Sequence, residues 1–253
     1  MFRILVLAVL CSLFILWNGE ARVVRPPVQP KTEVSQVLPE HEHDANCERT
    51  LATPVQIICI LDRSGSMSSV AEDTIGGYNT FLKKQKENPD AAEVTTVLFD
   101  DEYELTVDAM NLQEVPELTS KEYFARGTTA LLDAIGRTIT STVGKMQNEG
   151  ICPEKRRVLV MIMTDGLENA SNEYNKATVK KLIEETTEKY HWNYIFMGAN
   201  MDSVKEASAL GIDSRHAANF SHNRRGVEHS FDSMSRAAED VRREGAVAED
   251  WNE

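Results

Sequence analysis

The fold is decided by the ten residues Ile58-Cys59-Ile60-Leu61-Asp62-Arg63-Ser64-Gly65-Ser66-Met67. The first four are apolar, as expected of a strand buried on both faces of a parallel sheet. Asp62, Ser64 and Ser66 follow at alternating positions, and alternating side chains of an extended backbone point the same way. Their oxygens can therefore converge just past the end of the strand. Oxygen ligands of this kind hold hard divalent cations such as Mg2+, which usually keep some bound water.

Two later segments complete a pattern with this run. They are Arg126-Gly127-Thr128-Thr129-Ala130-Leu131-Leu132-Asp133-Ala134 and Val160-Met161-Ile162-Met163-Thr164-Asp165-Gly166. Together the three resemble the metal-ion-dependent adhesion site of von Willebrand factor type A domains, which combines Asp-x-Ser-x-Ser, a Gly-x-Thr-Ala-Leu loop and a strand ending in Thr-Asp-Gly. The resemblance covers roughly residues 53–218. Within the family it resembles compact, stand-alone bacterial or phage members.

The resemblance implies a divalent cation site, with Mg2+ as the expected ion and Mn2+ or Ca2+ as alternatives. The residues carried over as ligands are Asp62, Ser64, Ser66, Thr129 and Asp165. Thr128 is the alternative for the threonine position, since the loop offers both. In this family a carboxylate of a protein partner fills an open position on the ion. We therefore expect a protein-binding module whose partner presents an Asp or Glu side chain.

Other interpretations of these residues remain open from sequence alone. Taken without Thr129 and Asp165, Ser64 and Ser66 could instead cap the helix that follows, and Asp165 alone could be a turn residue before Gly166. If the site is real, five residues are candidates for its partner-contacting rim: Arg63, Met67, Arg126, Glu168 and Asn169.

The sequence favours binding over catalysis. It contains no G-x-S-x-G elbow, P-loop, glycine-rich dinucleotide turn or second carboxylate cluster, so we expect no enzyme. Four histidines belong to no motif and are expected to be ordinary surface or core residues: His191, His216, His222 and His229. Two alternatives are kept, a metal-dependent hydrolase and a structural domain in which a metal plays no role.

Composition bounds the class of protein and of partner. The 253 residues are 42% hydrophobic and 26% charged, which is ordinary globular usage and enough for one sizeable core. The formal net charge is −13. Because phosphate binding needs a basic face, this charge excludes nucleic acid as the expected partner.

From residue 54 onward, strand and helix patterns alternate, which indicates an α/β domain with a doubly wound, mostly parallel, Rossmann-like sheet and helices on both faces. Expected strands cover residues 55–61, 94–99, 103–107, 157–164, 194–198 and 215–220. Expected helices cover residues 69–87, 130–146, 176–190, 204–210 and 227–241. The second and third strands read as a hairpin across Asp100-Asp101, which would give the sheet one antiparallel edge.

In a doubly wound sheet, ligands bind beyond the carboxyl ends of the strands, where the strand order reverses. Asp62 and Asp165 each end a predicted strand, and Thr129 lies on the loop that enters the helix predicted at residues 130–146. The topology expected from the residues and the family resemblance thus place the same side chains on one edge.

The N-terminus predicts export. Met1-Phe2-Arg3 is a short basic start, residues 4–17 are almost continuously apolar, and Gly19-Glu20-Ala21 offers the small residues of a cleavage site. This is the layout of a secretory signal peptide over residues 1–21. Arg22 and Arg25 oppose transfer of the following segment, so an uncleaved anchor at residues 4–17 is the alternative. The expected location is extracytoplasmic, either secreted or periplasmic. Only the anchor would bring membrane contact.

Residues 22–52 read as a proline-rich linker, residues 53–244 as the domain, and residues 245–253 as an acidic tail that we expect to fray. Cys59 lies inside the first strand and is expected to be a buried apolar residue. A Cys47–Cys152 disulfide is left open by the sequence, because an odd number of cysteines after the signal segment gives no clear framework.

Overall fold

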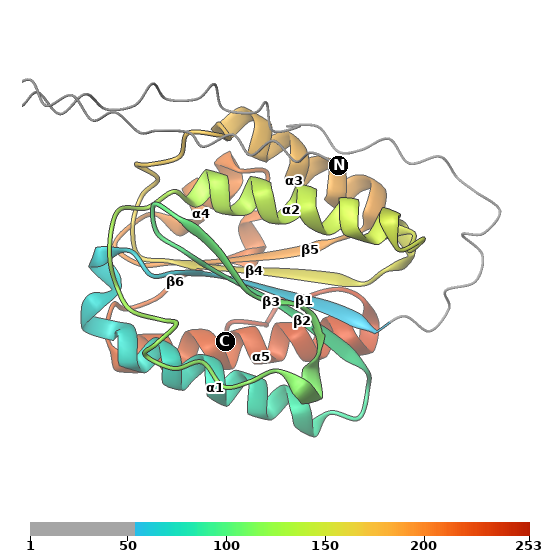
Figure 1. Cartoon of the computed structure of the whole chain (residues 1–253), viewed down its shortest axis with the longest axis horizontal. Coiled ribbons are helices and arrows are strands. Elements are labelled where there is room, and N and C mark those ends of the chain that lie inside the picture. The colour runs from blue at the N-terminus through green and yellow to red at the C-terminus, as the bar shows by residue number, and fades with distance from the viewer. Residues whose placement is uncertain (1–53) are drawn as a thin grey trace, which may run out of the picture. The chain divides into compact units, whose positions relative to one another are not determined.

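The computed structural model describes residues 54–253. The predicted signal peptide or anchor, the linker and Cys47 lie outside this range. The described chain forms one six-stranded sheet between two layers of helices (Figure 1). Its strands are β1 (Val55–Asp62), β2 (Ala92–Phe99), β3 (Tyr103–Asn111), β4 (Val158–Thr164), β5 (Asn193–Gly198) and β6 (Ala217–Asn219). Its helices are α1 (Ala71–Glu87), α2 (Leu131–Asn148), α3 (Lys176–Tyr190), α4 (Ser203–Ala209) and α5 (Arg224–Glu244).

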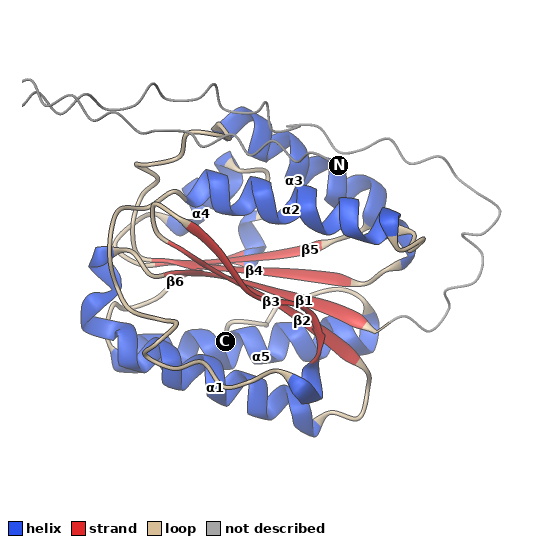
Figure 2. Cartoon of the chain, in the orientation of Figure 1, coloured by secondary structure: helices blue, strands red, loops and turns tan. Residues whose placement is uncertain are grey.

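The strand order is β3-β2-β1-β4-β5-β6, and every pair is parallel except β2 and β3. Helices α1 and α5 cover one face, while α2, α3 and α4 lie over the other (Figure 2). The expectation of a doubly wound α/β sheet with one antiparallel edge is confirmed.

The alternation of β1 explains both layers of the core. Ile57, Cys59 and Leu61 pack with the α1–α5 layer, whereas Ile58 and Ile60 pack with the α2–α3 layer. Successive side chains point to opposite faces of a sheet, so an apolar run without interruption is what a strand covered on both sides requires. Burial strongly raises the pKa of the Cys59 thiol, which stays free. Cys152 is disulfide-bonded.

Several element boundaries differ from expectation, and two of the differences concern β3 and α1. Strand β3 continues to Asn111, beyond the expected end at residue 107. The sequence did not show this extension, because the edge strand buries only Val107 and lacks a hydrophobic alternation. The first helix is preceded by a 3-10 turn at Gly65–Val70, so α1 starts at Ala71. Among the described residues, no helix has both the length and the apolar character to cross a membrane.

The expectation of a frayed tail is wrong. Trp251 is only 1% exposed and packs in the core with Val247 and the inner face of α5. Its indole Nε1 donates to the Arg215 carbonyl at 2.9 Å, and the Arg236 guanidinium donates to the Trp251 carbonyl at 3.0 Å. The sequence did not reveal that Trp251 docks, because this residue stands among charged residues and a single aromatic side chain produces no periodic pattern.

Trp251→Ala is expected to destabilise the protein by about 3–5 kcal/mol, because it removes a fully buried aromatic side chain from a packed core. The measurement is urea unfolding of the full chain. Trp251→Phe is the control: it keeps most of the volume and loses only the indole hydrogen bond, at a cost of about 1 kcal/mol. An unchanged midpoint for the alanine variant would show that the tail does not dock.

Candidate metal centre

The predicted site lies where the strand order reverses. From β1 the chain proceeds to β2 on one side and later returns as β4 on the other. Leu61 of β1 pairs with Met163 of β4, so Asp62 and Thr164, one residue further along, lie side by side at the carboxyl ends of the strands. Crevices of this kind bind ligands in open α/β sheets.

Asp62 is buried at the bottom of this edge. Its Oδ1 accepts a hydrogen bond from the Ser64 backbone N–H at 2.7 Å, and its Oδ2 accepts one from Thr164 Oγ1 at 2.6 Å. Burial raises the pKa of Asp62 to about 6; the hydrogen bonds from Thr164 and Ser64 oppose the rise, and the nearby Asp165 charge adds to it. Its carboxylate is thus desolvated and only partly compensated, a condition that a bound cation would relieve.

A chain of close oxygen contacts leads away from Asp62. Ser64 Oγ lies 3.1 Å from Ser66 Oγ, and Ser66 Oγ donates to Asp165 Oδ1 at 2.6 Å. Neighbouring ligands of octahedral Mg2+, each about 2.1 Å from the ion, would be roughly 3 Å apart. The spacing of these oxygens is therefore close to that of ligands sharing one ion, and the donor set fits a hard divalent cation.

Of the two threonines in this loop, Thr129 is the candidate that lies beside this group. Thr128 is exposed, whereas Thr129 is buried at the start of α2. A methyl group added to Gly166 would lie 3.2 Å from Thr129 Oγ1 and 3.8 Å from Ser66 Oγ. Glycine at this position therefore keeps open the space between the two hydroxyls. Asn169 fixes the loop: its Oδ1 accepts from the Thr129 N–H at 2.9 Å, and its own N–H donates to the Thr129 carbonyl at 3.1 Å.

The alternative roles of these side chains find no support. Ser64 precedes the 3-10 turn but makes no capping hydrogen bond with its side chain, and α1 is preceded by Val70, which has no hydroxyl. The capping interpretation is therefore wrong. Asp165 is hydrogen-bonded to Ser66, far away in sequence, so its role is not that of a local turn residue.

A buried ion pair holds the loops that carry these ligands. The Arg63 Nε donates to Asp100 Oδ2 at 2.9 Å, and both side chains are fully buried. Arg126 Nε donates to the same oxygen at 2.8 Å. Backbone bonds join the two loops directly, from the Arg126 N–H to the Arg63 carbonyl and from the Gly65 N–H to the Gly127 carbonyl. Gly127 has φ +63° and lies against Asp101, so a side chain there would clash.

The expected rim is largely corrected by these contacts. Arg63 and Met67 are fully buried and cannot touch a partner. Glu168 is occupied at the start of α2, where its Oε2 accepts from the Leu132 N–H at 2.9 Å. Asn169, though exposed, fixes the Thr129 loop. The Arg126 side chain is 39% exposed although it also bonds to Asp100, so it keeps surface that a partner can touch.

Sequence reasoning missed His222. It lies in the loop between β6 and α5, and its Nε2 is 2.8 Å from Asp165 Oδ2. No local pattern marks this histidine, because only the folded topology brings its loop to the carboxyl ends of β1 and β4. Within residues 54–253, no group of three or more His, Cys, Asp or Glu side chains is arranged to hold a metal. Any ion at this edge must therefore also use the serine and threonine hydroxyls.

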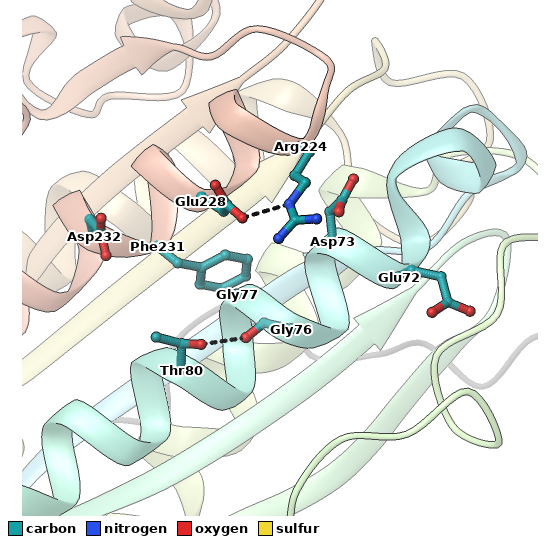
Figure 3. A pocket seen from close by; sticks show the side chains of 9 residues that line it. All are labelled: Glu72, Asp73, Gly76, Gly77, Thr80, Arg224, Glu228, Phe231 and Asp232. Carbon is teal, nitrogen blue, oxygen red and sulfur yellow. Dashed lines mark hydrogen bonds and ion pairs between the residues drawn. The ribbon is translucent and has the colours of Figure 1, made fainter.

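A groove of about 560 Å3 lies elsewhere, between α1 and α5 (Figure 3). Phe231 of α5 fits against Gly77 of α1, where a methyl group would lie 2.2 Å from the ring. The groove is lined by Glu72, Asp73, Gly76, Gly77, Thr80, Arg224, Glu228, Phe231 and Asp232. None of these is a candidate ligand, so the groove does not belong to the candidate metal centre.

Comparison with known proteins identifies the fold. No protein-family model matches the sequence, and no curated protein matches it either. Solved structures do. A von Willebrand factor type A protein from Catenulispora acidiphila is 13% identical with a TM-score of 0.50, over 74% of this chain and 43% of that one. Proximal thread matrix protein 1 from the mussel byssus is 15% identical with a TM-score of 0.51, over 73% and 48%.

A third match is the manganese-loaded TRAP protein of Plasmodium vivax, 16% identical with a TM-score of 0.50, over 70% of this chain and 71% of that one. This chain spans less than half of the first two proteins. At such low identity the likeness shows the fold alone. The fold is that of von Willebrand factor type A domains, as the three sequence segments implied.

Proposed function

We propose that this chain, which has the von Willebrand factor type A fold, is a divalent-cation-dependent protein-binding module. The observation that carries the proposal is the set of side-chain contacts from Ser64 through Ser66 to Asp165, a residue 99 positions further along the chain, beside the buried Asp62. Mg2+ is the first expectation because the donors are hard oxygens. Mn2+ and Ca2+ are alternatives, and manganese is supported by its presence in the similar TRAP protein.

The candidate ligands are of two chemical kinds. Asp62 and Asp165 supply negative charge, while Ser64, Ser66 and Thr129 supply neutral oxygens. When bound, a divalent cation would offer an electrophilic open position to a carboxylate oxygen of the partner. Ser66 is exposed, so the open side faces solvent and a partner's Asp or Glu can reach it.

Exposed apolar side chains near the site suit a protein surface. Leu167 is 57% exposed and stands two residues after Asp165. Phe124 is 44% exposed, and the guanidinium groups of Arg63 and Arg126 lie 5.5 and 5.3 Å from its ring centre. Together with Arg126, these two residues replace the rim expected from sequence. Aromatic and arginine side chains are enriched at protein interfaces.

A hydrolase is the weaker candidate. It would need a base or nucleophile poised beside the open position. The Asp62 carboxylate already accepts from Ser64 and Thr164, and Asp165 accepts from Ser66, which suits holding an ion better than moving protons. Metal-dependent turnover of p-nitrophenyl phosphate, lost in Asp62→Asn, would reverse this preference.

The expected setting is outside the cytoplasm, with residues 4–17 as an anchor if they are not cleaved. The N-terminal pattern supports export, and so does the disulfide bond of Cys152, since disulfides persist mainly in oxidising compartments. N-terminal sequencing of the protein recovered from its native host would distinguish cleavage after residue 21 from an intact anchor.

The binding test uses the immobilised full chain, exposed to extracellular protein in Mg2+ and then washed with EDTA. A partner that elutes in EDTA, and that Asp62→Asn fails to capture, is the expected result. Treating the same partner with a carbodiimide and an amine, which blocks its carboxyl groups, should abolish capture. Equal capture by wild type and variant would overturn the proposal.

Leu167→Ser is expected to weaken capture of that partner about tenfold, without changing metal affinity, because Leu167 offers exposed apolar area but no ligand atom. Surface plasmon resonance in Mg2+ measures the first quantity, and calorimetric titration of the metal the second. Val204→Ser is the matched control, since Val204 is also exposed, at 41%, but lies on α4. Equal effects of the two substitutions would remove Leu167 from the binding surface.

A further inference from the structure

We infer that Glu168 and Asp133 are positioning residues of the candidate metal centre. Their two carboxylates form a clasp that holds the loop after Asp165 against the start of α2, which follows Thr129 in the chain. Neither carboxylate is itself a candidate ligand. The inference rests on the proposed function, because it concerns the spacing of two candidate ligands of that site.

Glu168 joins its own loop to α2. Its Oε1 accepts from the Ala170 N–H at 2.9 Å and from the Ser171 N–H at 2.7 Å, both in the loop. Its Oε2 accepts from the Leu132 N–H at 2.9 Å. Helix α2 has no side-chain cap at its own N-cap position, and the first N–H groups of a helix need such an acceptor. The helix dipole also favours a carboxylate there.

Asp133 makes the reciprocal connection from α2 to the loop. Its Oδ2 accepts from the Asn172 N–H at 2.8 Å, and its Oδ1 accepts from the N–H groups of Glu173 at 2.9 Å and Tyr174 at 2.7 Å. Its own N–H donates to Ser171 Oγ at 3.0 Å. Between β4 and α3 the chain forms no helix or strand. The N–H groups of this loop therefore need acceptors from elsewhere, and α2 supplies one.

The clasp bears on the candidate ligands because each of its two sides carries one. Asp165 begins the loop, and Thr129 lies in the segment that leads into α2. Between them, Asn169 Oδ1 accepts from the Thr129 N–H at 2.9 Å, and the Asn169 N–H donates to the Thr129 carbonyl at 3.1 Å. Further along, the Tyr174 ring packs so closely on α2 that a methyl group at Gly136 would lie 2.3 Å from it. Opening the clasp would let Asp165 and Thr129 move apart.

The effect of the clasp on metal binding must be reciprocal. If an open clasp weakens metal affinity, a bound ion makes opening of the clasp rarer by the same factor. Residues that orient ligands typically change metal affinity by about tenfold or more when they are replaced. We therefore expect an effect of about tenfold in either direction.

The first test replaces Glu168 by glutamine, which keeps the size of the side chain but turns an amide NH2 towards N–H donors. In the full chain, Glu168→Gln should lower Mn2+ affinity about tenfold in calorimetric titration. Hydrogen exchange should become faster at the clasped N–H groups, those of residues 132 and 170–174. Glu173→Gln is the matched control, since Glu173 lies in the same loop but pairs with the Arg137 guanidinium at 2.5 Å. It makes the same change in charge and should bind Mn2+ as wild type does.

The second test uses wild type alone and so does not depend on the folding of a variant. Hydrogen exchange of the full chain is measured in Mn2+ and in EDTA. Exchange of the clasped N–H groups should be about tenfold slower in Mn2+. The loop between α1 and β2 is the internal control, because it lies at the opposite edge of the sheet, and its exchange should not change.

The outcomes distinguish the inference from the proposed function. Equal Mn2+ affinity of wild type and Glu168→Gln would overturn the inference and leave the proposed function standing. Mn2+ binding by wild type without slower exchange of the clasped N–H groups would do the same. No Mn2+ binding by wild type would overturn both.

Discussion

Asp62→Asn is expected to abolish the stabilisation of this protein by divalent cations while leaving the fold intact. In wild type, a metal that binds only the folded state raises the melting temperature with increasing concentration. Loss of one carboxylate from the centre of the site removes the charge that holds the ion. Thermal unfolding of the full chain in Mg2+, Mn2+ and EDTA measures the effect.

The fold should survive because asparagine can reuse the contacts of Asp62. Its oxygen can accept from the Ser64 N–H, and its amide can donate to Thr164 Oγ1, which itself lies 3.1 Å from the Gly166 carbonyl and can donate to it. In EDTA the variant should be more stable than wild type by about 2–3 kcal/mol at neutral pH, since each unit of raised pKa costs about 1.4 kcal/mol. Equal metal responses of both proteins would contradict the ligand role of Asp62.

The sign of the pH dependence follows from the same group. The folded-state pKa of Asp62, about 6, lies above its ordinary value of 3.8, so the folded protein holds this proton more tightly than the unfolded one. The stability that protonated Asp62 contributes is fully present at pH values below its ordinary pKa. It is lost as the pH rises towards its folded-state pKa. In EDTA, wild type should therefore lose stability relative to Asp62→Asn between these two pH values.

Arg63→Met is expected to cost about 3 kcal/mol and to weaken metal binding, although Arg63 touches no candidate ligand atom. Removing one member of a buried ion pair leaves the other charge poorly compensated, here Asp100, which is fully buried. The loops bearing Ser64 and Thr129 are joined next to this pair, so their spacing should loosen. Urea unfolding and calorimetric titration of the metal measure the two effects.

Arg126→Met is the matched control for that variant. Arg126 bonds to the same Asp100 oxygen, but its side chain is 39% exposed, so its loss should destabilise the protein much less than the loss of Arg63. If the two substitutions were equally destabilising, the buried pair would not be what holds the loops.

Much of the architecture was predictable because its signals are local. The apolar run before Asp62 indicates a strand covered on both faces, and the stripe of α2 indicates a helix. The convergence of Asp62, Ser64, Ser66 and Asp165 at one edge could also be inferred, because they follow strands whose positions in the sheet can be inferred; their role as metal ligands stays a prediction. The sequence does not show that Thr129 is buried and Thr128 exposed, which is what distinguishes the two candidates.

The residues whose roles the sequence did not reveal share a different cause. Arg63 was expected at the surface because it fills a variable position of the Asp-x-Ser-x-Ser pattern, and its ion pair with Asp100 forms only in the folded chain. Trp251 and His222 stand alone in polar surroundings, so no periodicity marks them. Each acquires its role only through partners distant in sequence, Arg215 for Trp251 and Asp165 for His222. The signal peptide and linker stay predictions, as they lie outside the described residues.

Calorimetric titration of Mn2+ into the full chain, as wild type and as Asp62→Asn, tests whether Asp62 holds a metal ion. We expect one ion bound per wild-type chain and none at the same concentrations for the variant. Absence of binding by wild type, or identical binding by both proteins, would contradict this expectation.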